Sequence, residues 1–187
     1  SGQWLIDPYD ITIENSPSMG GVIDANAIVS ALNGGAEVIV TTAGAGNQQG
    51  NMTLNADLHT GALPNDTTLT LHAHRNIVIN NGYSIDATQN GNTKKLNVVL
   101  WANSAGTGGG IEMGSNTAIR SNGGNIVLGG GTNIATGYAV GSSNYEGGRG
   151  IWMREATVLN AGGGNITLRG QGQEGGPQDP PAQGLQV

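Results

Sequence analysis

The sequence lacks cysteine and phenylalanine, and only 4% of its residues are aromatic. The absence of cysteine excludes disulfide bonds and thiolate metal sites. Charged residues make up 11% of the chain, where about 25% is usual. No apolar run approaches the roughly 20 residues that a membrane-spanning helix needs, so we expect a chain that is not membrane-spanning.

Positive charge is also scarce, because 7 Lys and Arg stand against 13 Asp and Glu, for a net charge of −6. Nucleic-acid binding needs a basic face, so we expect no nucleic-acid partner. Hydrophobic residues nevertheless reach 36%. Intrinsic disorder combines high net charge with low apolar content, and this chain does not fit that class.

Glycine is abundant, with 34 of 187 residues against a usual share of about 7%. It does not follow the every-third spacing of collagen. Each interior glycine costs a helix about 1 kcal/mol, so the composition disfavours long helices. The one helix candidate runs from Ala25 to Leu32, where Gly34 and Gly35 would end it.

Short alternating apolar runs, bounded by Gly, Asn or Ser, recur along the chain and predict half-buried strands between turns. In each strand alternate residues would point inward, and the residues between them, such as Thr53, Thr70, Glu112 and Thr167, would face solvent. The runs lie at residues 38–40, 52–54, 69–71, 77–79, 96–100, 111–113, 126–128, 151–153 and 166–168.

An internal repeat aligns the segment beginning at Gly110 with the segment beginning at Gly150, without a gap. Both contain a strand, a second short strand, a Gly-Gly-Asn turn and a third strand, and the motif at residues 184–187 resembles the same opening again. Constant strands with connections of variable length favour a β-solenoid, in which each coil stacks on the last. An antiparallel β-sandwich is the alternative.

Asparagine precedes several of these strands, at Asn51, Asn76, Asn125 and Asn165. An amide at such a position can bond to the backbone of a turn or to an Asn in the next coil.

The segment from Trp4 to Ile13 reads W-L-I-D-P-Y-D-I-T-I. It resembles a segment of filamentous-haemagglutinin-like exoproteins of bacterial two-partner secretion, which include high-molecular-weight adhesins and contact-dependent-inhibition proteins. The segment from Ile28 to Val40 and the later Gly-Asn-Ile repeats are similar to further coils of that family. The resemblance covers nearly the whole chain.

The resemblance implies an all-β, right-handed parallel β-helix with Gly-rich loops. The segment 1–187 would be cut from a longer repeat array, with first coils at 3–40, middle coils at 41–109 and repeated coils at 110–187. The repeated coils include a Gly/Pro-rich loop at 170–183.

The resemblance also implies a non-enzymatic, structural or adhesive piece of a secreted or cell-surface protein. Its expected partners are a host-cell, surface or matrix glycan or receptor. The family's secretion region carries Asn-Pro-Asn motifs, and this chain has no Asn-Pro. We therefore expect the outer-membrane transporter to be engaged by another part of the full-length protein. No cofactor is expected.

Trp101 and Trp152 fall at outward positions of their strands, where an indole can stack on a sugar ring. They are the candidate ligand-binding residues of a carbohydrate-binding module, the first alternative function. The competing interpretation is that connecting loops fold over both rings. Trp4 and Tyr9 are interpreted as a cap or loop anchor.

A polysaccharide lyase or hydrolase on a β-helix is the second alternative function. Such chemistry needs two carboxyl groups about 5 to 9.5 Å apart, and the sequence does not cluster them, so no catalytic residue is assigned. The candidates are Asp7, Asp10, Asp24 and Asp86, with Arg75, Arg120 and Arg154 as partners.

Two remaining sequence features concern metal binding and glycosylation. His72 and His74 share one parity, with His59 expected one coil earlier, but a solvated pair is the usual outcome and no metal site is assigned. Three triplets match the glycosylation acceptor pattern, at Asn51, Asn65 and Asn165. Turn bonding accounts for Asn51 and Asn165, which leaves Asn65 as the candidate acceptor.

Overall fold

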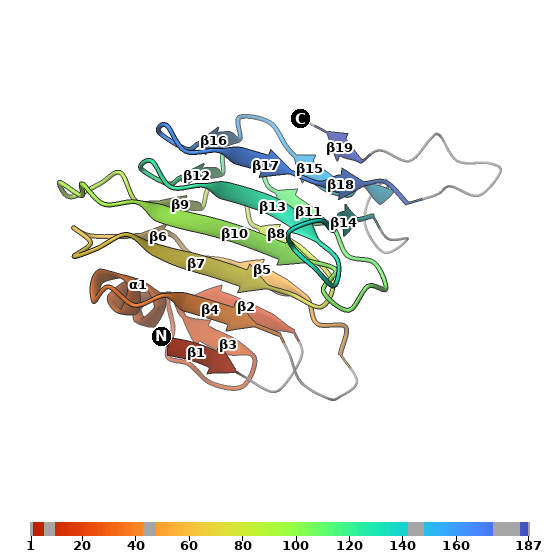
Figure 1. Cartoon of the computed structure of the whole chain (residues 1–187). Coiled ribbons are helices and arrows are strands. Elements are labelled where there is room, and N and C mark those ends of the chain that lie inside the picture. Colours follow the sequence, from red (N-terminus) through yellow and green to blue (C-terminus); the bar gives the residue numbers. More distant parts are fainter. Residues whose placement is uncertain (1, 6–9, 43–47, 142–147, 174–183, 187) are drawn as a thin grey trace.

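The computed structural model describes residues 2–5, 10–42, 48–141, 148–173 and 184–186. In this part the chain is mostly β, and the strands pair in parallel, with isolated antiparallel bridges at Met19 with Val22 and Gly109 with Val140. The parallel registers exclude the antiparallel sandwich alternative. Figure 1 shows the strands layered one above another, with the two ends of the chain at opposite ends of the molecule.

The six-stranded sheet takes its strands in sequence order and faces the viewer in Figure 1. Its strands are β1 (Gly2–Leu5), β4 (Val38–Thr41), β7 (Thr67–His72), β10 (Leu96–Ala102), β13 (Ile126–Gly130) and β17 (Ile166–Leu168).

The seven-stranded and four-stranded sheets also order their strands by sequence, except that β3 lies outside β2. The seven-stranded sheet holds β2 (Ile11–Glu14), β3 (Val22–Asp24), β5 (Met52–Leu54), β8 (Ile77–Ile79), β11 (Ile111–Met113), β15 (Ile151–Met153) and β19 (Leu185–Gln186). The four-stranded sheet holds β6 (Leu58–His59), β9 (Ser84–Asp86), β12 (Ala118–Arg120) and β16 (Val158–Asn160). A further pair is formed by β14 (Ala139–Val140) and β18 (Gly170–Gln171).

From β4 onward the chain passes through the six-stranded, seven-stranded and four-stranded sheets in turn and then returns to the first. Each such circuit is one round of the chain. The repeat found in the sequence follows this route. Ile111 pairs with Ile151, Ala118 with Val158 and Ile126 with Ile166, all at the offset of 40 residues. Leu185 then pairs with Ile151, which confirms the third copy of the motif as far as the described residues reach.

The core is a single cluster to which all three larger sheets contribute aliphatic side chains. Leu69 and Leu71 of β7 are fully buried, whereas Thr68 and Thr70 between them are half-buried. The same alternation holds for β5, β8, β11 and β15, where the predicted inward and outward positions are confirmed. It does not hold for β17, in which Ile166, predicted to point inward, is 44% exposed and Thr167, predicted to face solvent, is half-buried. Burial of these columns of Ile, Leu, Val and Met is the main stabilising contribution, at about 25 cal/mol per Å² of apolar surface.

Helix α1 (Ala25–Asn33) confirms the helix candidate. The Asp24 carboxylate caps it by accepting a hydrogen bond from the Asn26 N–H at 2.9 Å, and Gly35 follows its end at φ 85°. Its buried face, which includes Ile28 and Leu32, packs on β3, β4, β6 and β7. Among the described residues no helix has the length and apolar character required to cross a bilayer.

Asparagine side chains link successive rounds at the turns before the strands. The Asn51 Oδ1 accepts from the Asn76 Nδ2 at 3.0 Å, and the Asn76 Oδ1 accepts from the Gly110 N–H at 2.8 Å. In a second series the Asn97 Oδ1 accepts from the Asn125 N–H, and the Asn125 Oδ1 from the Asn165 N–H, each at 2.9 Å. These bonds are the ones expected of Asn at such turns, and three of the four satisfy backbone donors that strand pairing does not reach.

The Gly-Gly-Asn turn needs both of its glycines, for different reasons. Gly123 has a φ of 98°, in the left-handed region that favours glycine. A Cβ on Gly124 would collide with the backbone at Leu96 in the preceding round. The motif therefore allows one round to lie close to the next.

Replacing one inward side chain should cost far more than replacing its outward neighbour. We expect Leu71→Ala to lower the free energy of unfolding by about 2–5 kcal/mol, because Leu71 is fully buried and would leave a cavity. The matched control Thr70→Ala, on the same strand but pointing outward, should change it by less than about 1 kcal/mol. Urea titration followed by circular dichroism measures both, and equal losses would contradict the inward–outward assignment.

Candidate functional site

Trp101 lies on the outer face of β10, in register with His72 of β7. The two rings stack with centroids 4.2 Å apart and an interplanar angle of 26°. The Trp101 Nε1–H donates to the Gly131 carbonyl at 2.7 Å, in the connection that follows β13. Trp101 is half-buried, and His72 covers one face of its indole.

His72, Trp101 and Gly129 lie side by side on adjacent strands and form one outer column. The connection after β13 folds back over the last of these positions. That position is Gly129, which pairs with Trp101, and a Cβ there would stand 3.4 Å from both the Gly137 carbonyl and the Ile134 side chain. The Arg169 Nη1 donates to the Ile134 carbonyl at 3.1 Å and holds the connection in place. The contacts of this connection with Trp101 and Gly129 agree with the competing interpretation, in which connecting loops fold over the Trp101 ring.

The stacked His72 is biased toward its neutral form. Burial lowers the pKa of His72 below its usual value, and the charge of His74 lowers it further. Its Nδ1 lies 3.3 Å from the Thr41 hydroxyl. The imidazole therefore serves as a flat packing surface for the indole rather than as an exposed cation.

Trp152, on β15, is surrounded by cationic side chains. The guanidinium carbons of Arg154 and Arg149 lie 3.7 and 4.1 Å from the centre of its ring, within the range of cation–π attraction. Arg154 also forms an ion pair with Glu112. The two guanidinium groups occupy ring surface that a stacked sugar would need. A shallow depression of about 500 Å³ adjoins Trp152 and is lined by residues 153–157 and Ser115.

Asn65 is exposed, but its amide is engaged. The Asn65 Nδ2 donates to the carbonyls of Gly35 and Asp66, at 3.1 and 3.0 Å. An enzyme that adds a glycan must reach this nitrogen. Modification of Asn65 would therefore require the loss of two hydrogen bonds, one of which fixes the loop after α1 to the loop before β7.

His59 does not share a face with His72. His72 lies on the six-stranded sheet and His59 on β6 of the four-stranded sheet. Among the residues that the structure describes, no group of three or more His, Cys, Asp or Glu could hold a metal ion.

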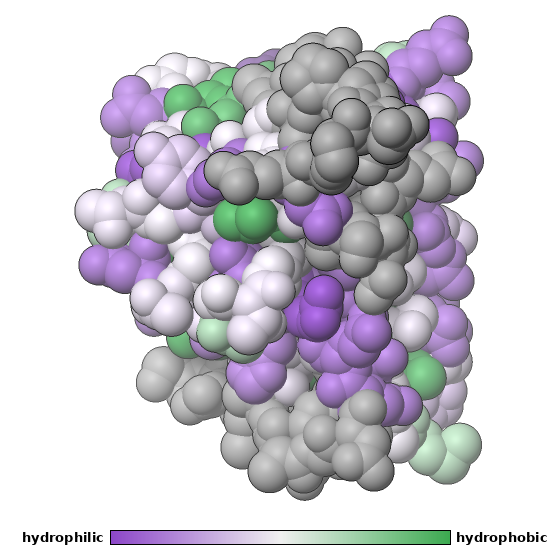
Figure 2. Space-filling view, turned by 90° about the vertical axis from the view of Figure 1, so that its right-hand side faces the viewer, coloured by the Kyte–Doolittle hydropathy of each residue, from purple (hydrophilic) through white to green (hydrophobic). Residues whose placement is uncertain are grey.

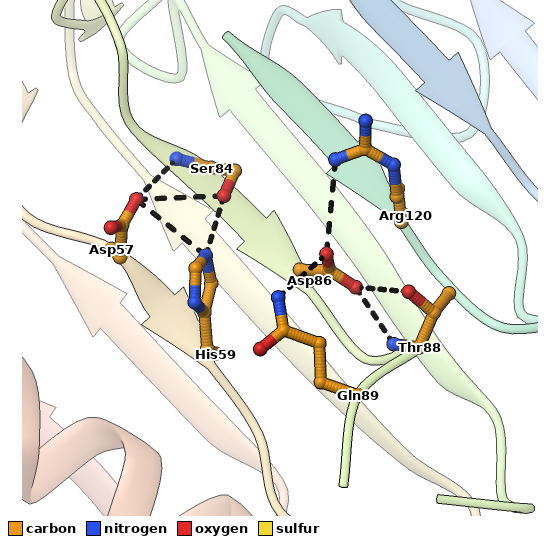
Figure 3. A network of polar contacts seen from close by, with 7 residues as sticks. All are labelled: Asp57, His59, Ser84, Asp86, Thr88, Gln89 and Arg120. Carbon is orange, nitrogen blue, oxygen red and sulfur yellow. Dashed lines mark hydrogen bonds and ion pairs between the residues drawn. The ribbon is translucent and has the colours of Figure 1, made fainter. Parts of the chain in front are cut away.

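A polar network on the four-stranded sheet was not anticipated from the sequence (Figure 3). The His59 Nε2 lies 2.6 Å from the Ser84 Oγ and 3.6 Å from the Asp57 Oδ1. These are the residue types of a hydrolase triad, but a triad requires Ser and Asp on different ring nitrogens. Here both approach Nε2, so the geometry is that of a polar cluster between strands. The signal was hidden because β6 and β9 repeat at a different spacing from the later rounds.

Asp86 forms the second part of the network in Figure 3. It is buried, and its carboxylate accepts hydrogen bonds from the Thr88 N–H at 2.8 Å, the Thr88 hydroxyl at 2.6 Å and the Gln89 Nε2 at 3.2 Å. Arg120 lies 3.7 Å away. Burial works to raise the pKa of Asp86, but these hydrogen bonds and the Arg120 charge together hold it below its usual value.

The other carboxylates considered for catalysis also bond to the backbone. The Asp10 Oδ1 accepts from the Asn51 N–H at 2.8 Å, and Asp24 caps α1. Asp7 and Tyr9 lie outside the described residues, as does the side chain of Trp4. Of the three arginines considered with them, Arg120 pairs with Asp86 and Arg154 with Glu112.

Comparisons with protein-family models, with curated proteins and with solved structures found no match to this chain.

The Asp86 network predicts that the free energy of unfolding declines at acid pH; this decline is the acid limb of the stability curve. Because its pKa is lower in the folded chain than the ordinary value of about 3.9, the ionised Asp86 stabilises the fold above that pH. This contribution should be lost as the pH falls through the folded pKa. Asp86→Asn should therefore flatten the decline of unfolding free energy below about pH 4.

Thermal melts between pH 2.5 and pH 7 measure this effect. Glu37→Gln, at an exposed carboxylate in the turn before β4, is the matched control and should leave the acid limb unchanged. An acid limb of the same slope in Asp86→Asn and in the unaltered chain would refute the role of Asp86.

Proposed function

We propose that the chain is a segment of a right-handed parallel β-helix from a filamentous-haemagglutinin-like exoprotein, secreted to or displayed on the bacterial surface. Its role is structural or adhesive: it supports or mediates attachment to cells, surfaces or matrix. The partner is a glycan or receptor on that surface, and the segment does no catalysis.

The observation that carries this proposal is the register of successive rounds. Ile77, Ile111 and Ile151 stand side by side in one sheet, and β9, β12 and β16 repeat the pattern in another. Passing through three parallel sheets in turn, with like residues stacked, is the path of a β-helix coil. Parallel crossover connections are right-handed in about 98% of cases, which supports the proposed hand.

The fate of the polar residues supports a scaffold rather than an enzyme. Asp10, Asp24 and Asp86 each bond to backbone groups that need a partner. The resemblance of the segment from Trp4 to Ile13 supports the family assignment, and the end of that segment forms β2.

Surface exposure of the chain in its source cells is the decisive test of the proposed location. Antibodies raised against residues 1–187 should label intact, unpermeabilised cells or detect the antigen in the culture supernatant. Brief protease treatment of intact cells should remove the label. Labelling that appears only after permeabilisation, together with an antigen that survives the protease, would overturn the surface assignment. An antibody to a ribosomal protein controls for cell integrity.

Trp101 separates the scaffold role from the carbohydrate-binding alternative. Because the indole packs on His72 and bonds to Gly131, we expect Trp101→Ala to lower the free energy of unfolding by about 2 kcal/mol. Retention on an array of immobilised glycans should not depend on the indole. A carbohydrate-binding module predicts the reverse, with lost glycan retention and an unchanged melting temperature. Trp152→Ala is the parallel variant on the other outward indole.

A further inference from the structure

A small pocket lies where the connections after β7, β10, β14 and β18 meet, with a volume of about 390 Å³. Figure 2 views the molecule from this side and shows hydrophilic residues over much of the visible surface, with hydrophobic residues in separate small groups. The pocket is lined chiefly by Arg75, Asn103, Thr107, Gly108, Val140 and Gln173.

The backbone of Arg75 is fixed from both sides. Its N–H donates to the Gly50 carbonyl at 3.1 Å, and its carbonyl accepts from the Asn103 N–H at 2.8 Å. Gly109, at φ 154°, comes so close to this backbone that a Cβ there would collide with the Arg75 carbonyl. The position of Arg75 is therefore set by the stacking of rounds and not by a partner for its charge.

The charge of Arg75 is unmatched within the described residues. Its Nε is buried without a hydrogen-bond partner, and none of the ion pairs of the described chain includes Arg75. Burying this donor without an acceptor is costly. Arg75 as a whole is half-buried and lines the pocket, so a ligand would contact its accessible atoms rather than the Nε. Arg120 and Arg154, by contrast, each have a carboxylate.

The rest of the pocket is polar but carries no second charge among its described lining. The Asn103 side chain is buried and already used, because its Oδ1 accepts from the Gly108 N–H at 2.7 Å and its Nδ2 donates to the Tyr138 carbonyl at 3.2 Å. It shapes the wall. Thr107 and Gln173 add a hydroxyl and an amide. One cation with neutral hydrogen-bonding groups suits a small monoanion that also carries hydroxyl groups.

We propose that this pocket binds the carboxylate of a sugar acid, with the Arg75 guanidinium as its principal contact. Arginine holds a carboxylate through two parallel hydrogen bonds, and one guanidinium balances one carboxylate. A volume of about 390 Å³ lies at the lower end of the range for small-molecule sites, which fits a single sugar unit. The proposal depends on the pocket alone and holds whether or not the chain is an adhesin.

Titration of the 187-residue chain with sodium galacturonate, at constant ionic strength, tests the proposal by isothermal calorimetry or by NMR shifts. We expect saturable binding of galacturonate and none of galactose, the neutral analogue. Arg75→Gln should weaken binding at least tenfold, and Arg75→Lys should weaken it less, because lysine keeps the charge but not the planar fork. Arg120→Gln is the matched control on another sheet and should bind as the unaltered chain does.

Two further measurements keep the outcome decisive. In the absence of ligand, Arg75→Gln should melt at the same temperature or higher, because it removes an unpaired buried donor; a large drop would assign Arg75 a merely structural role and overturn the proposal. Independently of Arg75→Gln, Thr107→Ala and Gln173→Ala should weaken galacturonate binding while leaving the chain folded. Sulfate or phosphate binding as tightly as galacturonate would show a general oxyanion site and refute the sugar acid. Absence of saturable galacturonate binding would refute the site itself.

Discussion

The parallel pairing of each round of chain with the next is the constraint on which the rest of this structure depends. It places like residues side by side, so that an aliphatic position stays aliphatic through successive rounds, as at Ile77, Ile111 and Ile151. A shift of one residue would move every one of these side chains to the outer surface. The asparagine series reinforces the register, because each amide reaches a backbone donor of the neighbouring round.

Because the inner positions are fixed in this way, the outer positions and the connections are free to differ from round to round. The column that contains Thr41, His72, Trp101 and Gly129 has a different side chain at every step. The connection after β13 is long and folds over its own sheet, whereas β7 and β8 are joined by a short turn. Any binding property of this chain must therefore arise at the outer positions or in the connections.

The strands of the later rounds could be predicted because the copies of the repeat that begin at Gly110 and Gly150 align without insertions. The register is therefore visible in the sequence as an offset of 40 residues. The strands β6 and β9 could not, because they repeat at another spacing and are only two and three residues long. The same limit concealed the contact of His59 with Ser84. Periodicity identifies which side of a strand a residue faces, but it does not identify the residue beside it when connections vary in length.

The two outward tryptophans and Arg75 show how misleading residue type can be on such a scaffold. Trp101 and Trp152 are of the residue type expected at a sugar-stacking site. Yet His72 packs on the Trp101 ring, and two guanidinium groups pack on the Trp152 ring. Arg75 has no distinguishing sequence motif, yet its Nε and the Thr60 Oγ1 are the two buried side-chain atoms that lack a hydrogen-bond partner in the described structure. On a flat stack of strands, neighbours in adjacent rounds satisfy most outward side chains. A functional group is therefore better sought among the side chains that the stacking leaves unsatisfied than among those of the expected type.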